Sequence, residues 1–262
     1  MTFQMKYSIE QQYLPPQTLR RPATKNKGII FIVAHDTGND GSTAKANVSY
    51  FCNSANEIAA SAHVFVDDHN IIECIPLNEK AYHVRYNVTT DNELYGCNAN
   101  DNAIGVELCY SNKRGRIDNA EAYKRYVWYM AYLCDKFNLD PQKKISGHNE
   151  LDPSRKTDPY KNAFQAMGIS RQKFLADVEA ELAYCRQLSN EDNKEDDVMK
   201  LQKWQKDLIV SGITEFGKLK GADGMPLINS PQAWIQKVNN GTLTVHDLAI
   251  INFAVTSRQV VK

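Results

Sequence analysis

A short apolar run, "GIIFIVAHD" at residues 28–36, constrains the fold more than any other stretch of the chain. The run is rich in β-branched residues and has no polar side chain until its end, which is typical of a strand that is buried on both faces. Such a strand belongs at the centre of a sheet that is covered by helices. The run therefore predicts an α/β fold, with His35 at the end of a central strand, where ligands bind in open sheets.

Other segments before residue 190 alternate between strand and helix patterns. Strand patterns occupy "HVFVDD" (63–68), "IIECIP" (71–76), "AIGVELCY" (103–110) and "KKISGH" (143–148), and the first two form a predicted hairpin. Helical patterns occupy residues 43–53, 119–137 and 170–187, and Asp118 can cap the second of these, with Glu121 three residues on. We therefore predict an α/β domain with a central mixed β-sheet flanked by helices.

The segment "SNEDNKEDD" (189–197) marks the sharpest change of composition along the chain. It has five acidic residues, one lysine and no apolar residue, which is typical of a solvated linker. The sequence thus predicts a main domain at residues 1–188, an acidic linker at 189–197 and a small all-helical module at 198–262.

The predicted module consists of three short helices. The residues that indicate them are Val198, Leu201, Trp204 and Leu208 on one face of the first, Pro231 at the start of the second, and Thr244 with Asp247 at the cap of the third. About 65 residues is near the lower size limit for independent folding. The module is therefore expected to need a partner, which is either the main domain or a second copy of the chain.

Charge and composition exclude several classes of protein. The 31 basic and 31 acidic residues balance, and the pI is near 7, which argues against binding of nucleic acid or of anionic membranes through bulk charge. No apolar run reaches the roughly 18 residues of a membrane span, and the first residues lack the apolar core of a signal peptide. We therefore expect synthesis in the cytoplasm and no membrane insertion. The six cysteines form no C-x-x-C pair and are expected to be buried, unpaired residues.

Polar residues at two strand ends could hold a metal ion. His35 and His148 each end a predicted strand, and Asp158 follows ten residues after His148. Two imidazoles and a carboxylate are suitable ligands for a catalytic zinc ion, and Pro153 and Pro159 restrict the intervening loop. Each signal is weak by itself, because single histidines at strand ends are more often structural and Asp-Pro pairs more often form turns. The residues alone leave a metal site and a plain solvated loop both open.

The segment "GHNELDPSRKTDP" (147–159) resembles the C-terminal motif of the type-2 zinc N-acetylmuramoyl-L-alanine amidases, which include phage endolysins and are related to the peptidoglycan recognition proteins. Other segments match the family in the same order. They are "IIFIVAHDTG" (29–38), "SAHVFVDDHNIIECIP" (61–76), "AYHV" (81–84) and "NAIGVELCYS" (102–111). The resemblance covers about residues 25–165 and implies the amidase and peptidoglycan-recognition fold.

The resemblance implies a zinc amidase domain with one Zn²⁺ per chain. His35, His148 and Asp158 match the zinc ligands, and Glu107 matches the general base. Lys156 matches the residue that stabilises the oxyanion. The position of Glu107 in an apolar strand should raise the pKa of its carboxyl group, and strict alternation should turn the flanking apolar residues to the opposite face of the sheet.

Other matched positions surround this centre. His83 and Arg155 match substrate-binding positions, and His63 matches a supporting or structural position in the hairpin. The chain departs from the family pattern at two places. Asp36 stands where a histidine or asparagine is usual, and Tyr160 stands where a glycine often follows the last proline.

The resemblance implies hydrolysis of the amide bond between N-acetylmuramic acid and L-alanine in bacterial peptidoglycan. With no evident signal peptide, the natural setting is a phage or prophage endolysin that reaches the cell wall after a holin opens the membrane. Two alternatives remain, a cytosolic amidase that recycles muropeptides and a non-catalytic peptidoglycan-binding module. The helical module either binds the wall or serves only for packing or self-association.

Overall fold

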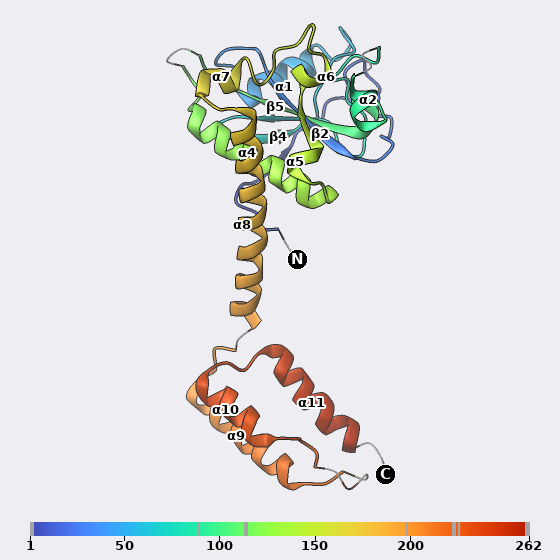
Figure 1. The fold of residues 1–262 in the computed structure, drawn as a ribbon. Coiled ribbons are helices and arrows are strands. Elements are labelled where there is room, and N and C mark those ends of the chain that lie inside the picture. Colours follow the sequence, from blue (N-terminus) through green and yellow to red (C-terminus); the bar gives the residue numbers. More distant parts are fainter. Residues whose placement is uncertain are drawn as a thin grey trace. The chain divides into compact units, whose positions relative to one another are not determined.

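The computed structural model of the chain describes residues 3–87, 90–112, 115–197, 199–221, 224 and 226–259. The chain divides into two compact units, Phe3–Arg186 and a second one that begins at Gln187. Each unit has its own apolar core. Figure 1 shows the sheet and helices of the first unit and the helices of the second.

The first unit is built on one mixed sheet, as predicted. Within the described residues its six strands lie in the order β1-β4-β3-β5-β2-β6, and only the β3–β4 hairpin is antiparallel. The strands are β1 (Glu10–Gln11), β2 (Phe31–Asp36), β3 (Val64–Val66), β4 (Ile71–Glu73), β5 (Ala103–Leu108) and β6 (Ile145–Gly147). All residues of β2 are buried, and this strand lies between β5 and β6. The apolar run at 28–36 therefore forms a central strand.

Helices precede and follow the strands of this unit. They are α1 (Ala44–Asn53), α2 (Thr90–Tyr95), α3 (Ala99–Asn102), α4 (Asn119–Phe137), α5 (Pro141–Lys144), α6 (His148–Leu151), α7 (Ala163–Met167) and the first part of α8 (Arg171–Asp197), which continues past the end of this unit at Arg186. Asp118 caps α4 by accepting hydrogen bonds from the backbone N–H groups of Ala120 and Glu121. Only half of a reciprocal capping box forms, because the N–H of Asp118 donates to Asp68 instead.

Alternation along the strands divides the core into two layers. Ile32 and Ala34 of β2 join the larger apolar cluster, which also includes buried residues of α4 and α8. Phe31 and Val33 belong to a smaller cluster on the opposite face, with Ala99 of α3 among its members. Burial of each large apolar side chain contributes roughly 1.5–3 kcal/mol. The face with the smaller cluster is the one toward which His35 points.

Helix α8 is longer than the sequence pattern predicts. It continues to Asp197, so the backbone of the predicted linker at 189–197 is helical. The stretch 171–197 contains neither glycine nor proline, and nothing in its backbone chemistry therefore ends the helix at residue 187. Its acidic composition indicates solvation, which is compatible with a helix.

The second unit contains α9 (Lys203–Lys218), α10 (Pro231–Asn240) and α11 (Val245–Gln259). Pro231 opens α10 as predicted. The predicted cap of α11 is also present, since the N–H of Asp247 donates to the hydroxyl of Thr244 and the N–H of Thr244 donates to the carboxylate of Asp247. Ile213 and Val238 are among the residues that form the core of this unit.

The first tail helix starts later in the chain than the sequence pattern predicts. It begins at Lys203, so Leu201 precedes it, and Val198 lies outside the described residues. The predicted shared face therefore holds only for Trp204 and Leu208, which lie one turn apart on α9. Both are exposed, at 61% and 66%, whereas Ile213 of the same helix is buried.

The sequence predicts unpaired cysteines and no membrane-spanning segment. The six cysteines all lie in the described part of the chain, and all are free. None of the described helices combines the length and the apolar character that a membrane span requires.

Candidate active site

The sheet brings His35 and Glu107 together. His35 lies near the carboxyl end of β2, where it is 2% exposed, and Glu107 is its register partner on the parallel neighbour β5. Partners on adjacent strands point to the same face of a sheet. Val106 and Leu108 belong to the larger apolar cluster on the other face, as alternation predicted.

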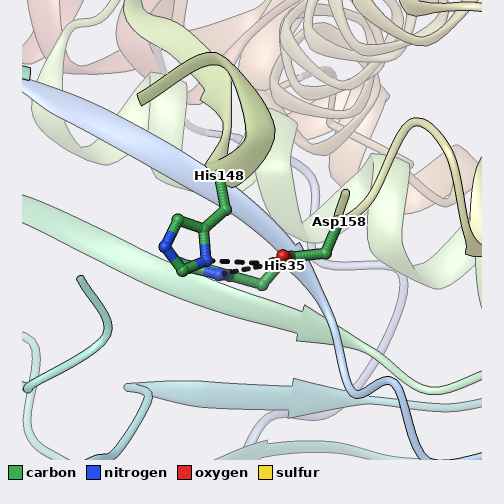
Figure 2. A group of neighbouring side chains, drawn as sticks. All are labelled: His35, His148 and Asp158. Atoms are coloured by element: carbon green, nitrogen blue, oxygen red, sulfur yellow. Dashed lines mark hydrogen bonds and ion pairs between the residues drawn. The ribbon is translucent and has the colours of Figure 1, made fainter. Parts of the chain in front are cut away.

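A loop that follows β6 brings two further polar side chains to His35. His148 is the first residue of α6, and Asp158 lies ten residues later. One carboxylate oxygen of Asp158, Oδ2, lies 3.1 Å from Nδ1 of His35 and 3.1 Å from Nδ1 of His148 (Figure 2). One possible ligand atom from each of the three residues lies within 4.8 Å of the other two. The structure therefore brings His35 beside two residues that are far from it in the sequence.

The protonation states of His35 and Asp158 suit a metal ion. Burial, together with the nearby His148, lowers the pKa of His35 to about 4, so its imidazole is neutral at pH 7. Burial tends to raise the pKa of Asp158, but its hydrogen bonds with His148 and His35 outweigh this and hold the pKa below its ordinary range. Neutral imidazole and ionised carboxylate are the forms that bind zinc. Two imidazole nitrogens and one carboxylate oxygen also match a catalytic zinc site with one position left open.

Glu107 has the properties of a proton carrier. Burial and the nearby carboxylates of Asp158 and Asp36 raise the pKa of Glu107 well above its ordinary value. Its Oε2 atom is buried and has no hydrogen-bond partner among the described residues. Burial of an unpaired carboxyl group is costly, which favours a functional over a structural role.

His83 and His63 lie side by side next to β5. Nδ1 of His83 is 3.0 Å from Nε2 of His35, and the imidazole of His83 packs directly over Gly105, where a Cβ atom would come within 2.6 Å of the ring. His63 is fully buried. Its Nδ1 accepts the N–H of Gly105 at 3.0 Å, and its Nε2 is 3.1 Å from the carbonyl oxygen of Glu79 and donates to it. These contacts support a structural position for His63, beside the cleft and not in it.

The predicted site residues other than His63 line one cleft of ≈580 Å³. They are His35, His83, Glu107, His148, Arg155, Lys156 and Asp158. Sequence patterns missed Arg20 and Tyr50, which also line the cleft. Arg20 is buried and its Nε donates to Ser54 after the end of α1, so it braces one wall. Nothing in the local sequence distinguishes this arginine from its neighbour.

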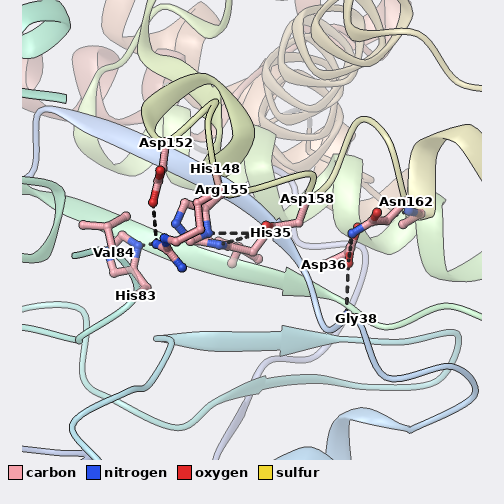
Figure 3. A network of polar contacts seen from close by, with 12 residues as sticks. His35, Asp36, Gly38, His83, Val84, His148, Asp152, Arg155, Asp158 and Asn162 are labelled. Carbon is pink, nitrogen blue, oxygen red and sulfur yellow. Dashed lines mark hydrogen bonds and ion pairs between the residues drawn. The ribbon is translucent and has the colours of Figure 1, made fainter. Parts of the chain in front are cut away.

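Asp152 organises the basic side of the cleft. It forms an ion pair with Arg155 (Figure 3). Its carbonyl oxygen accepts the backbone N–H of Lys156 at 2.9 Å. The positive charge of Lys156 acts to lower the pKa of Glu107, which agrees with a position near that carboxyl group. Arg155 is thus engaged by a neighbouring carboxylate, whereas the charge of Lys156 acts on Glu107.

Asp36, at the first departure from the family pattern, has a structural task. Its carboxylate accepts the N–H of Gly38 at 3.0 Å and that of Ala163 at 3.1 Å, and it also contacts the side-chain amide of Asn162 (Figure 3). Asp36 therefore ties the end of β2, which carries His35, to the segment that follows the loop with Asp158.

Comparison with known proteins identifies the family. Residues 25–161 match the profile of the N-acetylmuramoyl-L-alanine amidases. The chain belongs to this family. It is 36% identical over 147 residues to N-acetylmuramoyl-L-alanine amidase BlyA of Bacillus subtilis, covering 53% of this chain and 39% of BlyA. It is 38% identical over 123 residues to the amidase CwlA of the same species, covering 45% and 40% of the two chains. The chain thus spans about two fifths of these curated relatives.

Two solved structures share the fold of this chain. The structure of PlyL is 26% identical with a TM-score of 0.52, over 66% of this chain and 97% of PlyL. The catalytic domain of XlyA is 24% identical with the same TM-score, over 66% and 99% of the two chains, and shows the fold alone. The predicted α/β amidase fold and the predicted family are both confirmed.

Proposed function

We propose that this chain hydrolyses the amide bond between N-acetylmuramic acid and L-alanine in bacterial peptidoglycan, with one zinc ion held by His35, His148 and Asp158. One observation carries the proposal. The ligand atoms of these residues converge within 4.8 Å, in the same cleft as Glu107, in a chain of the amidase family. The relatives from Bacillus are themselves named N-acetylmuramoyl-L-alanine amidases.

The zinc ion, Glu107 and Lys156 would have separate roles in the proposed hydrolysis. A bound zinc ion would supply a Lewis acid that polarises the scissile carbonyl and acidifies water. Glu107 would take the proton of the attacking water and return it to the leaving amine, for which a raised carboxyl pKa is favourable. The ammonium group of Lys156 would stabilise the negative charge that develops on the carbonyl oxygen.

The cleft also offers groups that would hold the substrate. His83 and Arg155 line it and would contact the sugar or the peptide. Tyr50, which is 57% exposed at the cleft, could stack on a sugar ring and hydrogen-bond through its hydroxyl group. Peptidoglycan presents both kinds of group, which supports a glycopeptide as the substrate class.

The biological role that we propose is that of an endolysin, which waits in the cytoplasm and acts on the cell wall after release through a holin. An endolysin from Bacillus subtilis is among the solved structures of similar fold, at 24% identity. The recycling of muropeptides is the alternative for the same chemistry, and only a lysis experiment separates the two.

The second unit is proposed as a wall-binding or self-association module. Trp204 and Leu208 are one helical turn apart on α9 and expose their apolar side chains, and Phe253 of α11 is 73% exposed. If the module binds walls, the Trp204→Ala variant should sediment less with purified walls than the unmodified chain. If it serves for association, the variant should instead lower the mass measured by light scattering.

The test of the proposed chemistry compares the chain with its Asp158→Asn variant, which preserves size and removes the charge. We expect about one zinc per chain and release of N-terminal alanine from cell walls, both lost or strongly reduced in the variant. Asp177→Asn, a carboxylate on α8 with partners outside the cleft, is the matched control and should retain both. A zinc-free chain that binds walls without releasing alanine would instead be a recognition module.

A further inference from the structure

Glu150 lies in α6 two residues after His148, and it joins three partners that are separate in the sequence. Its Oε2 atom accepts the backbone N–H of Gly147 at 2.8 Å and the hydroxyl of Tyr160 at 2.9 Å. Its Oε1 atom accepts Nε–H of Arg171 at 2.7 Å. The first contact alone would be an ordinary helix cap, but the other two have no capping role.

These partners bracket the loop that carries two of the proposed zinc ligands. Gly147 directly precedes His148, and Tyr160 follows Asp158 by two residues. A second hydrogen bond links the two ends of this loop, because the N–H of Asn149 donates to the carbonyl oxygen of Asp158 at 2.9 Å. The carboxylate of Glu150 therefore connects the entry of the loop to its exit.

The packing of Gly147 and Tyr160 leaves the two ends of this loop little freedom to move. A Cβ atom on Gly147 would come within 2.8 Å of the ring of Tyr160, so this ring rests directly on the glycine backbone. The Glu150 side chain is only 27% exposed, and its partner Arg171 lies on α8. Without the carboxylate, the N–H of Gly147 and the hydroxyl of Tyr160 would lose their partner, which favours a different loop conformation.

We infer that Glu150 is a positioning residue that sets the separation of His148 and Asp158 for metal binding. The inference rests on the proposed zinc site. A residue can orient a metal ligand without binding the metal itself. Removal of such a residue typically changes metal affinity 10- to 100-fold. Glu150 acts through Gly147 and Tyr160, and it does not touch the metal position.

The test measures zinc affinity by competition with a chromophoric chelator, together with the visible spectrum of the Co²⁺-substituted protein. Glu150→Ala should weaken zinc binding about 10- to 100-fold and alter the cobalt spectrum, because the geometry of the ligands changes. Glu150→Gln should stay within about threefold of the unmodified protein, since one amide oxygen can still accept from both Gly147 and Tyr160.

A matched control separates loop positioning from general loss of an ion pair. Asp177 also accepts a hydrogen bond from a tyrosine hydroxyl, that of Tyr123 at 2.8 Å, and forms an ion pair with Lys173 at 2.7 Å. It does not contact the loop that carries His148 and Asp158 in either of these interactions. Asp177→Ala should leave both the zinc affinity and the cobalt spectrum unchanged. If Asp177→Ala changed the two readouts as much as Glu150→Ala, the effect would be global and the inference would fail.

Two further outcomes are distinct. Zinc affinity and a cobalt spectrum that are unchanged in Glu150→Ala would overturn the positioning role and leave the proposed function intact, whereas an unmodified chain that binds no zinc would overturn both. If Glu150→Ala does not fold, Tyr160→Phe removes only the hydroxyl group and should weaken zinc binding several-fold. Unchanged affinity in Tyr160→Phe would then refute the inference.

Discussion

A methyl group added at Gly105 should disturb the candidate active site more than its size suggests. In Gly105→Ala, the new Cβ would lie 2.6 Å from Cγ, 2.7 Å from Nδ1 and 3.0 Å from Cβ of His83. Carbon atoms pack best at about 3.5–4.0 Å, so the ring must move by roughly 1 Å. His83 has little freedom to move, because the side chain of Asn100 accepts the backbone N–H groups of both His83 and Val84.

The cost can be estimated from this geometry. Overpacking of this kind typically costs about 1–3 kcal/mol. For a unit of this size, each kcal/mol lowers Tm by roughly 2–4 °C, so thermal unfolding of Gly105→Ala should occur about 2–12 °C lower. The displaced ring of His83 is the neighbour of His35, and misplacement by about 1 Å can reduce the rate about 100-fold.

The assay follows thermal unfolding and release of alanine from cell walls. Gly212→Ala is the control, because a Cβ there meets no atom within 4 Å, and alanine in the middle of α9 should be neutral or stabilising. In a His83→Ala background, the penalty of Gly105→Ala should shrink, since only the contact with the Cβ atom at 3.0 Å remains. An unchanged Tm and rate in Gly105→Ala, or a penalty that is equally large without the His83 ring, would refute this reasoning.

Two other predictions concern buried carboxyl groups. Asp101→Asn should lower stability by about 1 kcal/mol, because Asp101 accepts the ammonium of Lys80 at 2.6 Å and that of Lys27 at 2.8 Å. These hydrogen bonds outweigh desolvation and lower the pKa of Asp101 to about 2, so the stabilisation is complete above the unfolded-state pKa of about 3.9. Denaturant titrations should show the difference between the two proteins vanishing as the pH falls toward 2. Glu107→Gln should reduce alanine release about 10²- to 10⁴-fold in a rate assay. Because burial raises the pKa of Glu107, the same substitution should stabilise the metal-free protein increasingly as the pH rises above about 4.3, and a loss of stability there would contradict the assigned environment.

Local patterns were sufficient for five of the six described strands of the sheet, but they missed β1, which has only two residues. The apolar run that ends at His35 indicates a central strand because burial on both faces requires apolar residues throughout. The alternation of side chains along a strand correctly assigned Glu107 to the face opposite Val106 and Leu108. Local patterns placed the start of the first tail helix too early, since Leu201 was assigned to a helix that begins only at Lys203. The sequence has no strong cap that marks this start.

The linker illustrates a different limit. Composition could not distinguish a helix from an irregular connection, and α8 continues through the predicted linker to Asp197. The bracing roles of Arg20, Asp36 and Glu150 were also not predictable, because each depends on partners from distant parts of the chain.

The sequence by itself determined the α/β class, the strand that carries His35 and, through its motifs, the family and the candidate ligands. Only the tertiary structure decided that Asp158 meets His35, which lies 123 positions away, and that the packing of His83 requires a glycine at 105. The physical reason is that strand patterns express local burial, whereas a site is made of long-range contacts. The distances between the groups of the site, and the pKa values of those groups, are set only when the sheet and its loops have packed together.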